Sequence, residues 1–180
     1  MEKAISELIE KLGYDIEDPN FKDTPSRVQR MFKEFEKPGY EEITNLFKSK
    51  FPTNYKGMVC QKGIKTFGLC PHHLKDITYS ISFGIIYTEL ALGLSKFTRV
   101  FKRMSKQLIL QEELTQQIAN AIEQNLRPKG FAIVVSGVHG CMSCRGVQQA
   151  VPTITAIVTG PFNEDQKTRE EFFRHISAGN

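Results

Sequence analysis

The spacing of apolar residues predicts two helices in the first part of the chain. One face of residues 2–12 is apolar, which is the pattern of an amphipathic helix, and Gly13 ends it. The stretch "DTPSRVQRMFKEFEK" begins with Asp23 or Thr24 as a cap and Pro25 in the first turn, so a second helix is expected there. The apolar positions of the two helices are Ile5, Leu8, Ile9, Leu12, Val28, Met31, Phe32 and Phe35.

From residue 56 onward the pattern changes to β-branched and aromatic runs, with alternation in "TYSISF". The predicted strands are residues 56–69, 76–90, 131–140 and 150–160, and the predicted helices are residues 95–107, 110–126 and 168–176. An antiparallel β-β-α-α-β-β sheet backed by two helices on one face is an α+β layout. Its open edges must be covered or paired, and assembly into a ring through these edges is one solution.

Composition and charge narrow the class of protein. With 180 residues, 40% of them apolar and 24% charged, the chain can bury a core without disulfides. No apolar run is long enough to cross a membrane, and "MEKAISELIEKL" is unlike a secretory signal. We therefore expect a cytoplasmic protein with reduced thiols and no membrane partner. The net charge of +4 is too small to indicate nucleic acid binding, but it fits an anionic small substrate.

Two short segments hold three of the four His and three of the four Cys residues. Cys70 and His73 have the C-x-x-H spacing with which two ligands reach one ion from a tight turn. His139 and Cys141 form H-x-C, and on an extended backbone such residues would share a face. If the first segment is also extended, His72 and His73 point in opposite directions, so that one binds metal and the other faces a substrate.

Two other interpretations remain open for these residues. Each Cys could be a small buried hydrophobe and each His an ordinary hydrogen-bonded side chain. A closed structural zinc site of Cys70, His73, Cys141 and Cys144 is also possible, and the C-x-x-C spacing favours it. That closed site would leave His72 and His139 without a role.

The sequence resembles GTP cyclohydrolase I along most of its length. The motifs that carry the resemblance occur in the family's order: "DTPSRV", "LCPHHL", "LGLSKFTRV", "LQEELTQQIA", "VHGCMSCRGV" and "TREEF". The resemblance implies a tunnelling fold, in which β-β-α-α-β-β units pair edge to edge into a barrel-like homo-oligomer, a decamer in this family. It further implies an N-terminal helical region over residues 1–50 and a catalytic domain over residues 51–180.

The resemblance also implies an activity, which is zinc-dependent conversion of GTP to 7,8-dihydroneopterin triphosphate and formate, the first step of pterin, folate or deazapurine biosynthesis. The family's Zn²⁺ ligands fall on Cys70, His73 and Cys141, and its acid–base histidines on His72 and His139. Three ligands leave one position for water, and histidine titrates near neutral pH, so both assignments suit hydrolysis.

Further residues are assigned to the substrate by the same resemblance. Glu112 matches the carboxylate that binds guanine, and Gln111 matches a neighbour of the family's substrate site. The triphosphate-binding positions fall on Ser95, Lys96, Arg99 and Arg145. From helix chemistry alone, Glu112 would be an ordinary acid near a helix start, and the basic residues a solvated face.

The chain departs from the family pattern at two places. Pro71 stands where the family commonly has Glu, and residues 75–80 replace an apolar stretch with Pro, Phe and Gly. These departures keep open an enzyme of the same fold that acts on another purine nucleotide. A separate alternative is a non-catalytic, zinc-stabilised oligomer that binds nucleotides or a partner, with Cys144 as a fourth zinc ligand.

Overall fold

The computed structural model describes residues 1–178, which form two compact units with a boundary after Glu36. The first unit contains both predicted helices, α1 (Glu2–Lys11) and α2 (Thr24–Lys33). Pro25 lies in the first turn of α2 as expected, but the Asp23 side chain does not cap the helix and instead pairs with Arg27 at 3.3 Å. No helix in the described part of the chain is long and apolar enough to cross a membrane.

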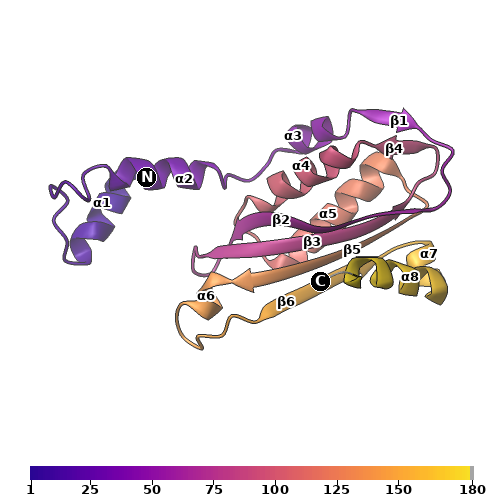
Figure 1. Ribbon diagram of the computed structural model, residues 1–180. Helices are drawn as coiled ribbons and strands as arrows, with labels where there is room; N and C mark the ends of the chain where they lie inside the picture. Colours follow the sequence, from indigo (N-terminus) through magenta and orange to yellow (C-terminus); the bar gives the residue numbers. More distant parts are fainter. Residues whose placement is uncertain (179–180) are drawn as a thin grey trace. The chain divides into compact units, whose positions relative to one another are not determined.

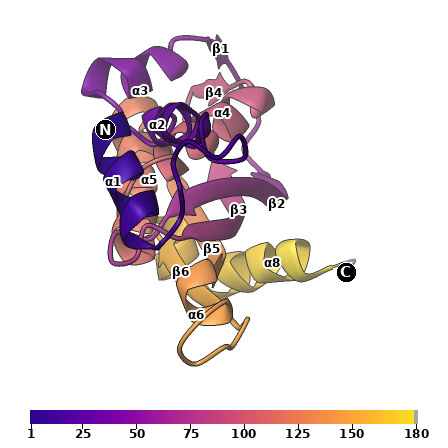
Figure 2. The same cartoon turned by 90° about the vertical axis from the view of Figure 1, so that its left-hand side faces the viewer.

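The second unit is built on the predicted antiparallel sheet. Its strands are β2 (Met58–Leu69), β3 (Asp76–Ile86), β5 (Gly130–His139) and β6 (Pro152–Val158), in the spatial order β2-β3-β5-β6. Helices α4 (Leu94–Ser105) and α5 (Gln111–Leu126) lie along one face of the sheet (Figures 1 and 2). The predicted α+β order β-β-α-α-β-β is therefore confirmed.

The core lies between the sheet and these two helices. Alternate residues of β3 from Ile77 to Ile85 face the helices and are buried, because successive side chains of a strand point to opposite faces. Phe83 packs its ring 4.4 Å from that of Phe97 and 6.0 Å from that of Phe131, measured between ring centroids. This aromatic cluster fixes α4 against β3 and β5.

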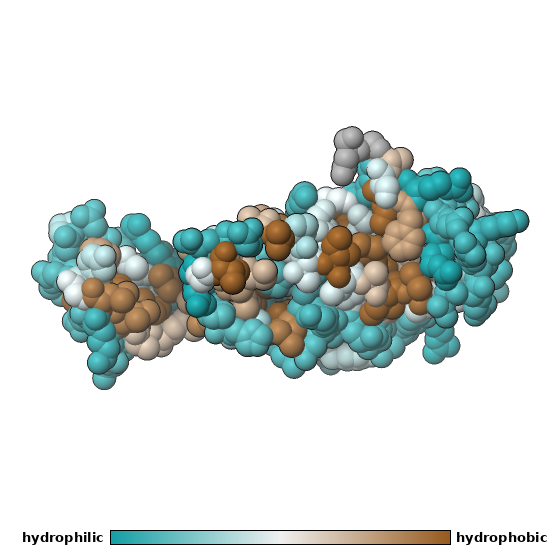
Figure 3. All heavy atoms as spheres, turned by 90° about the horizontal axis from the view of Figure 1, so that it is seen from below, coloured by the Kyte–Doolittle hydropathy of each residue, from teal (hydrophilic) through white to brown (hydrophobic). Residues whose placement is uncertain are grey.

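The opposite face of the sheet is covered only in part. Helices α7 (Pro161–Glu164) and α8 (Gln166–Ser177) pack Phe162 and Phe172 against Ala132. Phe172 approaches β3 at Gly84, where any Cβ would lie 2.7 Å from its ring. Figure 3, seen from the side of β6 and α8, shows hydrophobic patches between hydrophilic areas, and Phe67 and Ile154 on β2 and β6 are 54% and 65% exposed.

Several short elements were not predicted. They are α3 (Tyr40–Leu46), the pair formed by β1 (Lys50–Pro52) and β4 (Leu90–Leu92), α6 (Gly140–Ser143) and α7. Strands of three residues carry too little alternation to be recognised, and their pairing joins segments far apart in the chain. The expectation of an extended backbone from His139 to Cys141 is wrong, because β5 ends at His139 and Cys141 lies in α6.

Candidate active site

The predicted metal and catalytic residues meet at one end of the sheet. There the β2–β3 turn, the start of α5 and the β5–α6 junction surround a pocket of about 250 Å³. Seven of the predicted site residues line it: Cys70, His72, His73, Gln111, Glu112, His139 and Cys141. Segments up to 71 residues apart in the sequence are thus brought to one place.

The turn that carries both histidines is held by backbone hydrogen bonds at its two ends. The Cys70 N–H donates to the carbonyl of Lys75 at 2.8 Å, and the Leu74 N–H donates to the carbonyl of Cys70 at 2.9 Å. Leu74 has a φ of 51°, a left-handed conformation that ends the turn. Pro71 lies at its start, where its fixed φ suits a helical turn. His72 and His73 are therefore not on an extended backbone, and their ring planes stand at 73° to each other.

Cys70, His73 and Cys141 form a group of potential metal ligands. Their ligand atoms all lie within 4.8 Å of one another, and the two Sγ atoms are 3.8 Å apart. Tetrahedral zinc with Zn–S bonds of about 2.3 Å places its two sulfurs about 3.8 Å apart, so the donor set and its spacing fit zinc. Burial and the neighbouring Cys70 raise the pKa of Cys141, so a metal must displace a proton there.

Cys144 lies outside this group. It is exposed one residue after α6, and among residues 1–178 the ligand group contains only Cys70, His73 and Cys141. Gly140 allows the close approach of α6 to β3, since a Cβ there would lie 2.7 Å from Oδ1 of Asp76. The arrangement does not form the closed four-ligand site that the C-x-x-C spacing favoured.

Gln111 fixes the protonation of His139. The Gln111 amide nitrogen donates to the backbone carbonyls of Val135 and Thr153 at 3.1 and 2.9 Å, which makes its Oε1 the atom that faces His139. This oxygen is 3.0 Å from Nε2 of His139, so Nε2 carries the proton and Nδ1 is left as the acceptor. Burial lowers the pKa of His139, while the carboxylate of Glu112 acts in the opposite direction.

Glu112 lies in the first turn of α5 and is exposed at the edge of the pocket. The adjacent Gln111 is 2% exposed, so the first turn of the helix presents one buried amide and one solvated carboxylate. The sequence indicated a neighbour role for Gln111 but not its hydrogen bonds, because these depend on β5 and β6.

The family model for GTP cyclohydrolase I matches residues 1–177. The chain belongs to the GTP cyclohydrolase I family. Curated proteins named GTP cyclohydrolase 1 are similar over nearly the whole chain. The protein of Sulfurihydrogenibium is 38% identical, covering 99% of this chain and 94% of that one. The protein of Homo sapiens is 37% identical, covering 96% and 70%.

The protein of Aquifex aeolicus is 36% identical, covering 98% of this chain and 95% of its own. Among solved structures, an archaeosine synthase QueF-Like in the apo form aligns with a TM-score of 0.47 and 17% identity, over 60% of this chain and 97% of that chain. A likeness at that level carries no weight for fold or function. Membership of the family rests on the family model and on the curated relatives.

Four of the residues that match the family's substrate positions do not line the pocket. Ser95, Lys96 and Arg99 lie at the start of α4, whereas the carbonyl of Ser105, the last residue of α4, lies beside Gly68 at the pocket end of β2. A helix of this length spans about 18 Å, so the start of α4 is far from the metal ligands of the same chain. Arg145 is exposed beyond α6.

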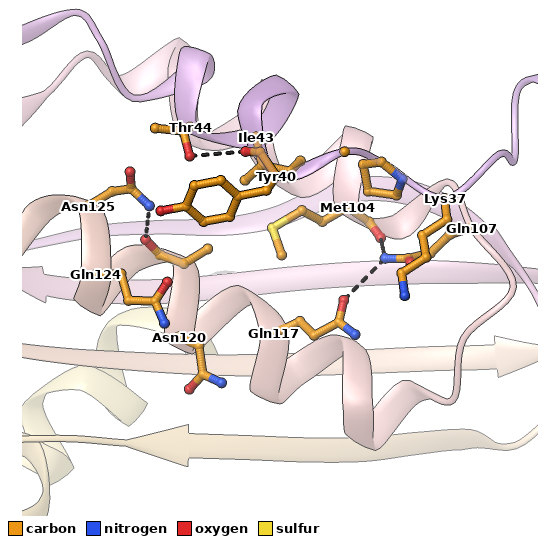
Figure 4. A pocket seen from close by; sticks show the side chains of 13 residues that line it. Lys37, Tyr40, Ile43, Thr44, Met104, Gln107, Gln117, Asn120, Gln124 and Asn125 are labelled. Atoms are coloured by element: carbon orange, nitrogen blue, oxygen red, sulfur yellow. Dashed lines mark hydrogen bonds between the residues drawn. The ribbon is translucent and has the colours of Figure 1, made fainter.

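A second pocket lies between α3, α4 and α5 and has a volume of about 190 Å³ (Figure 4). Its polar groups are mostly amides, of which Gln107 donates to the carbonyl of Met104 at 2.6 Å and Asn125 to that of Ala121 at 2.9 Å. The ring of Tyr40 is directed toward Asn125. The pocket contains no acid, Cys or His, so it lacks the groups needed for acid–base or metal chemistry.

Proposed function

We propose that this protein is a zinc-dependent GTP cyclohydrolase I, which converts GTP to 7,8-dihydroneopterin triphosphate and formate. The observation that carries the proposal is the pocket in which three metal ligands and two further histidines converge. Membership of the family supports the substrate and the reaction. The ligands would be Cys70, His73 and Cys141, and zinc bound by three protein ligands supplies a water that is acidic enough to ionise near neutral pH.

The two other histidines would move protons. His139 presents Nδ1 as an acceptor, since Gln111 holds the proton on Nε2, and its lowered pKa keeps it a neutral base. His72 is exposed on the turn beside the ligands, so it can deliver a proton to the purine while remaining in exchange with solvent. These are the roles that a hydrolysis followed by ring opening requires.

Glu112 would recognise guanine. A carboxylate accepts from N1–H and the 2-amino group together, and adenine lacks that pair of donors. Its exposure at the pocket edge leaves both oxygens available to a ligand. The pocket of about 250 Å³ lies below the usual range of about 300–1,000 Å³ for ligand sites, so one chain supplies only part of the site.

Assembly of several copies would supply the rest. The outer edges of β2 and β6 have no partner strand within the described residues, and edges of this kind pair between chains. We propose a homo-oligomer, a decamer, in which Ser95, Lys96, Arg99 and Arg145 bind triphosphate at a site shared between copies. A site shared between copies would explain why the start of α4 lies far from the metal ligands of its own chain. The catalytic domain would be residues 51–180, following an N-terminal helical region of residues 1–50.

The test is incubation of zinc-loaded protein with GTP, with formate and the fluorescent pterin measured in the same sample. We expect both products in equal amounts, and neither from a His72→Ala variant that contains the same amount of zinc. Folded, zinc-loaded protein that forms no product would overturn the proposal.

A second candidate, a same-fold enzyme for another purine nucleotide, is favoured by the place of Pro71 in the pocket wall. Comparing turnover of GTP with that of dGTP and other purine triphosphates separates the two. Faster turnover of another nucleotide would favour the second candidate.

A further inference from the structure

Thr155 lies on β6, at one side of the central sheet, and its hydroxyl contacts the first two turns of α5. Its Oγ1 is 2.6 Å from Oγ1 of Thr115 and 3.3 Å from Nε2 of Gln111. Gln111 and Thr115 are four positions apart on the helix, so their side chains lie on one face, one turn apart. A single hydroxyl of the sheet therefore bridges two successive turns of the helix.

The neighbouring hydrogen bonds determine in which direction each hydroxyl donates. Thr115 donates to the backbone carbonyl of Gln111 at 2.8 Å, which uses its one hydrogen. Thr155 must then donate to Thr115, and its lone pairs are left to accept from the amide of Gln111. Thr115 and Gln111 are 1% and 2% exposed, so water has little access to these contacts.

The first turn of α5 begins without a capping side chain. Leu110 precedes it, and an apolar side chain cannot accept from the free N–H groups that begin a helix. The turn nevertheless carries Gln111, whose Oε1 lies 3.0 Å from Nε2 of His139, and Glu112 at the edge of the pocket. Contacts with the sheet hold this turn instead, through the amide nitrogen of Gln111, which reaches oxygens of Val135, Thr153 and Thr155.

Thr155 is the one of these three acceptors that offers a side-chain oxygen. The carbonyls of Val135 and Thr153 belong to the backbone and do not depend on which residues stand there. They already suffice for the two hydrogens of the Gln111 amide, so the orientation of this amide does not depend on Thr155 alone. What Thr155 adds is the link to Thr115, which joins the amide, the strand and the second turn of the helix in one cluster.

A second threonine makes a comparable contact at the other end of the same helix. Thr159 directly follows β6, and its hydroxyl donates to Oε1 of Glu123 in the last turn of α5 at 2.7 Å. It lies four residues beyond Thr155, about 13 Å along the strand direction. Neither Thr159 nor Glu123 lines the pocket of the metal ligands. The two threonines thus link opposite ends of α5 to the sheet, and the end at Thr155 carries the site residues.

We propose that Thr155 is a positioning residue, which holds the first turn of α5 against the sheet and so places Gln111 and Glu112 in the pocket. The inference rests on the proposed function, in which Glu112 binds guanine and Gln111 orients His139. Thr155 itself does not line the pocket. It can still affect catalysis without touching the substrate, because a displacement of about 1 Å at the site can cost about 100-fold in rate.

The test uses three variants of the full-length protein: Thr155→Val, which keeps the shape but loses the hydroxyl, Thr155→Ser, which keeps the hydroxyl, and Thr159→Val as the control. With zinc-loaded protein and GTP, Thr155→Val should raise KM and lower kcat, so that kcat/KM falls by up to about 100-fold. Thr155→Ser and Thr159→Val should retain the kcat and KM of the parent. A purely structural role of Thr155 would reduce the amount of folded enzyme and leave KM unchanged.

Hydrogen exchange of the metal-free protein tests the same contact without any reaction. The Leu114 N–H donates to the carbonyl of Leu110 at 2.9 Å and the Arg127 N–H to that of Glu123 at 3.1 Å, so these amides report the opening of opposite ends of α5. Exchange should accelerate at Leu114 in Thr155→Val and at Arg127 in Thr159→Val.

Unchanged exchange at Leu114 in Thr155→Val would overturn the inference, and so would a kcat/KM equal to that of the parent. A parent protein that forms no product from GTP would overturn the proposed function instead. In that case the exchange at Leu114 would still decide whether Thr155 holds the first turn of α5.

Discussion

The two ends of the central sheet are built from the same strands but gather different kinds of side chain. Toward the end where β5 begins, Phe83, Phe97 and Phe131 pack into an apolar cluster in which each ring is 0% exposed. At the other end, the pocket is lined by the thiols of two cysteines, the imidazoles of three histidines and the amide of Gln111. The buried hydroxyl of Tyr79 lies on the adjoining part of β3. One end buries apolar side chains, and the other gathers polar groups that a metal or a substrate would contact under the proposed function.

The difference shows how a single core supports a reactive site. At the polar end, glycines at positions 68, 137 and 140 bring backbone and side chains close together, because Cβ atoms there would collide with Tyr79, Gln111 or Asp76. Substitutions at the two ends should therefore separate function from stability.

The largest functional effect should come from Cys141→Ala. Removing one of three ligands leaves too few donors to retain zinc, so zinc content and GTP turnover should both fall below detection. Cys144→Ala is the matched control, because that thiol is exposed outside the ligand group. A Cys144→Ala variant that lost its zinc would show that the ligand set is not the one in this structure.

The largest effect on folding should come from Phe83→Ala. Truncation of a fully buried aromatic ring leaves a cavity and costs about 3–5 kcal/mol of unfolding free energy. Urea denaturation of the metal-free protein measures this loss, with Phe67→Ala on the exposed side of β2 as the control. Equal losses in the two variants would contradict the placement of the core on the helix-covered face.

The sequence anticipated the aromatic end better than the polar end. Periodicity was sufficient to predict the four strands of the central sheet and to place α4 and α5 on one face, because burial repeats regularly along them. The structure brings the predicted ligands Cys70, His73 and Cys141 together, but the extended backbone expected from His139 to Cys141 was wrong, since a helix begins between them. The contacts of Gln111 reach residues 24 and 42 positions away, and no local pattern reports such distances.

A moderate effect is expected from Gln111→Leu. The variant keeps the size of the side chain but removes the acceptor for Nε2 of His139, so the imidazole is free to take the other tautomer. We expect kcat to fall by at most the roughly 10²–10⁴-fold that a positioned general base contributes, with zinc content unchanged. The ¹⁵N shifts of His139 in the metal-free protein report the tautomer directly. A parent protein with the proton on Nδ1 would contradict this role.

The smallest effects are expected from two residues with a left-handed backbone conformation, one at each end of the sheet. Leu74 closes the histidine turn with a φ of 51°, and Arg127 ends α5 with a φ of 46°. Glycine relieves the left-handed strain of about 1–2 kcal/mol but costs chain entropy, so each substitution should stabilise the protein by at most about 1 kcal/mol. Thermal unfolding should show similar gains for Leu74→Gly and Arg127→Gly. Only Leu74→Gly should reduce GTP turnover, because it loosens the turn that orients His72 and His73. Equal activity in the two variants would mean that the metal, rather than the backbone, holds the turn in place.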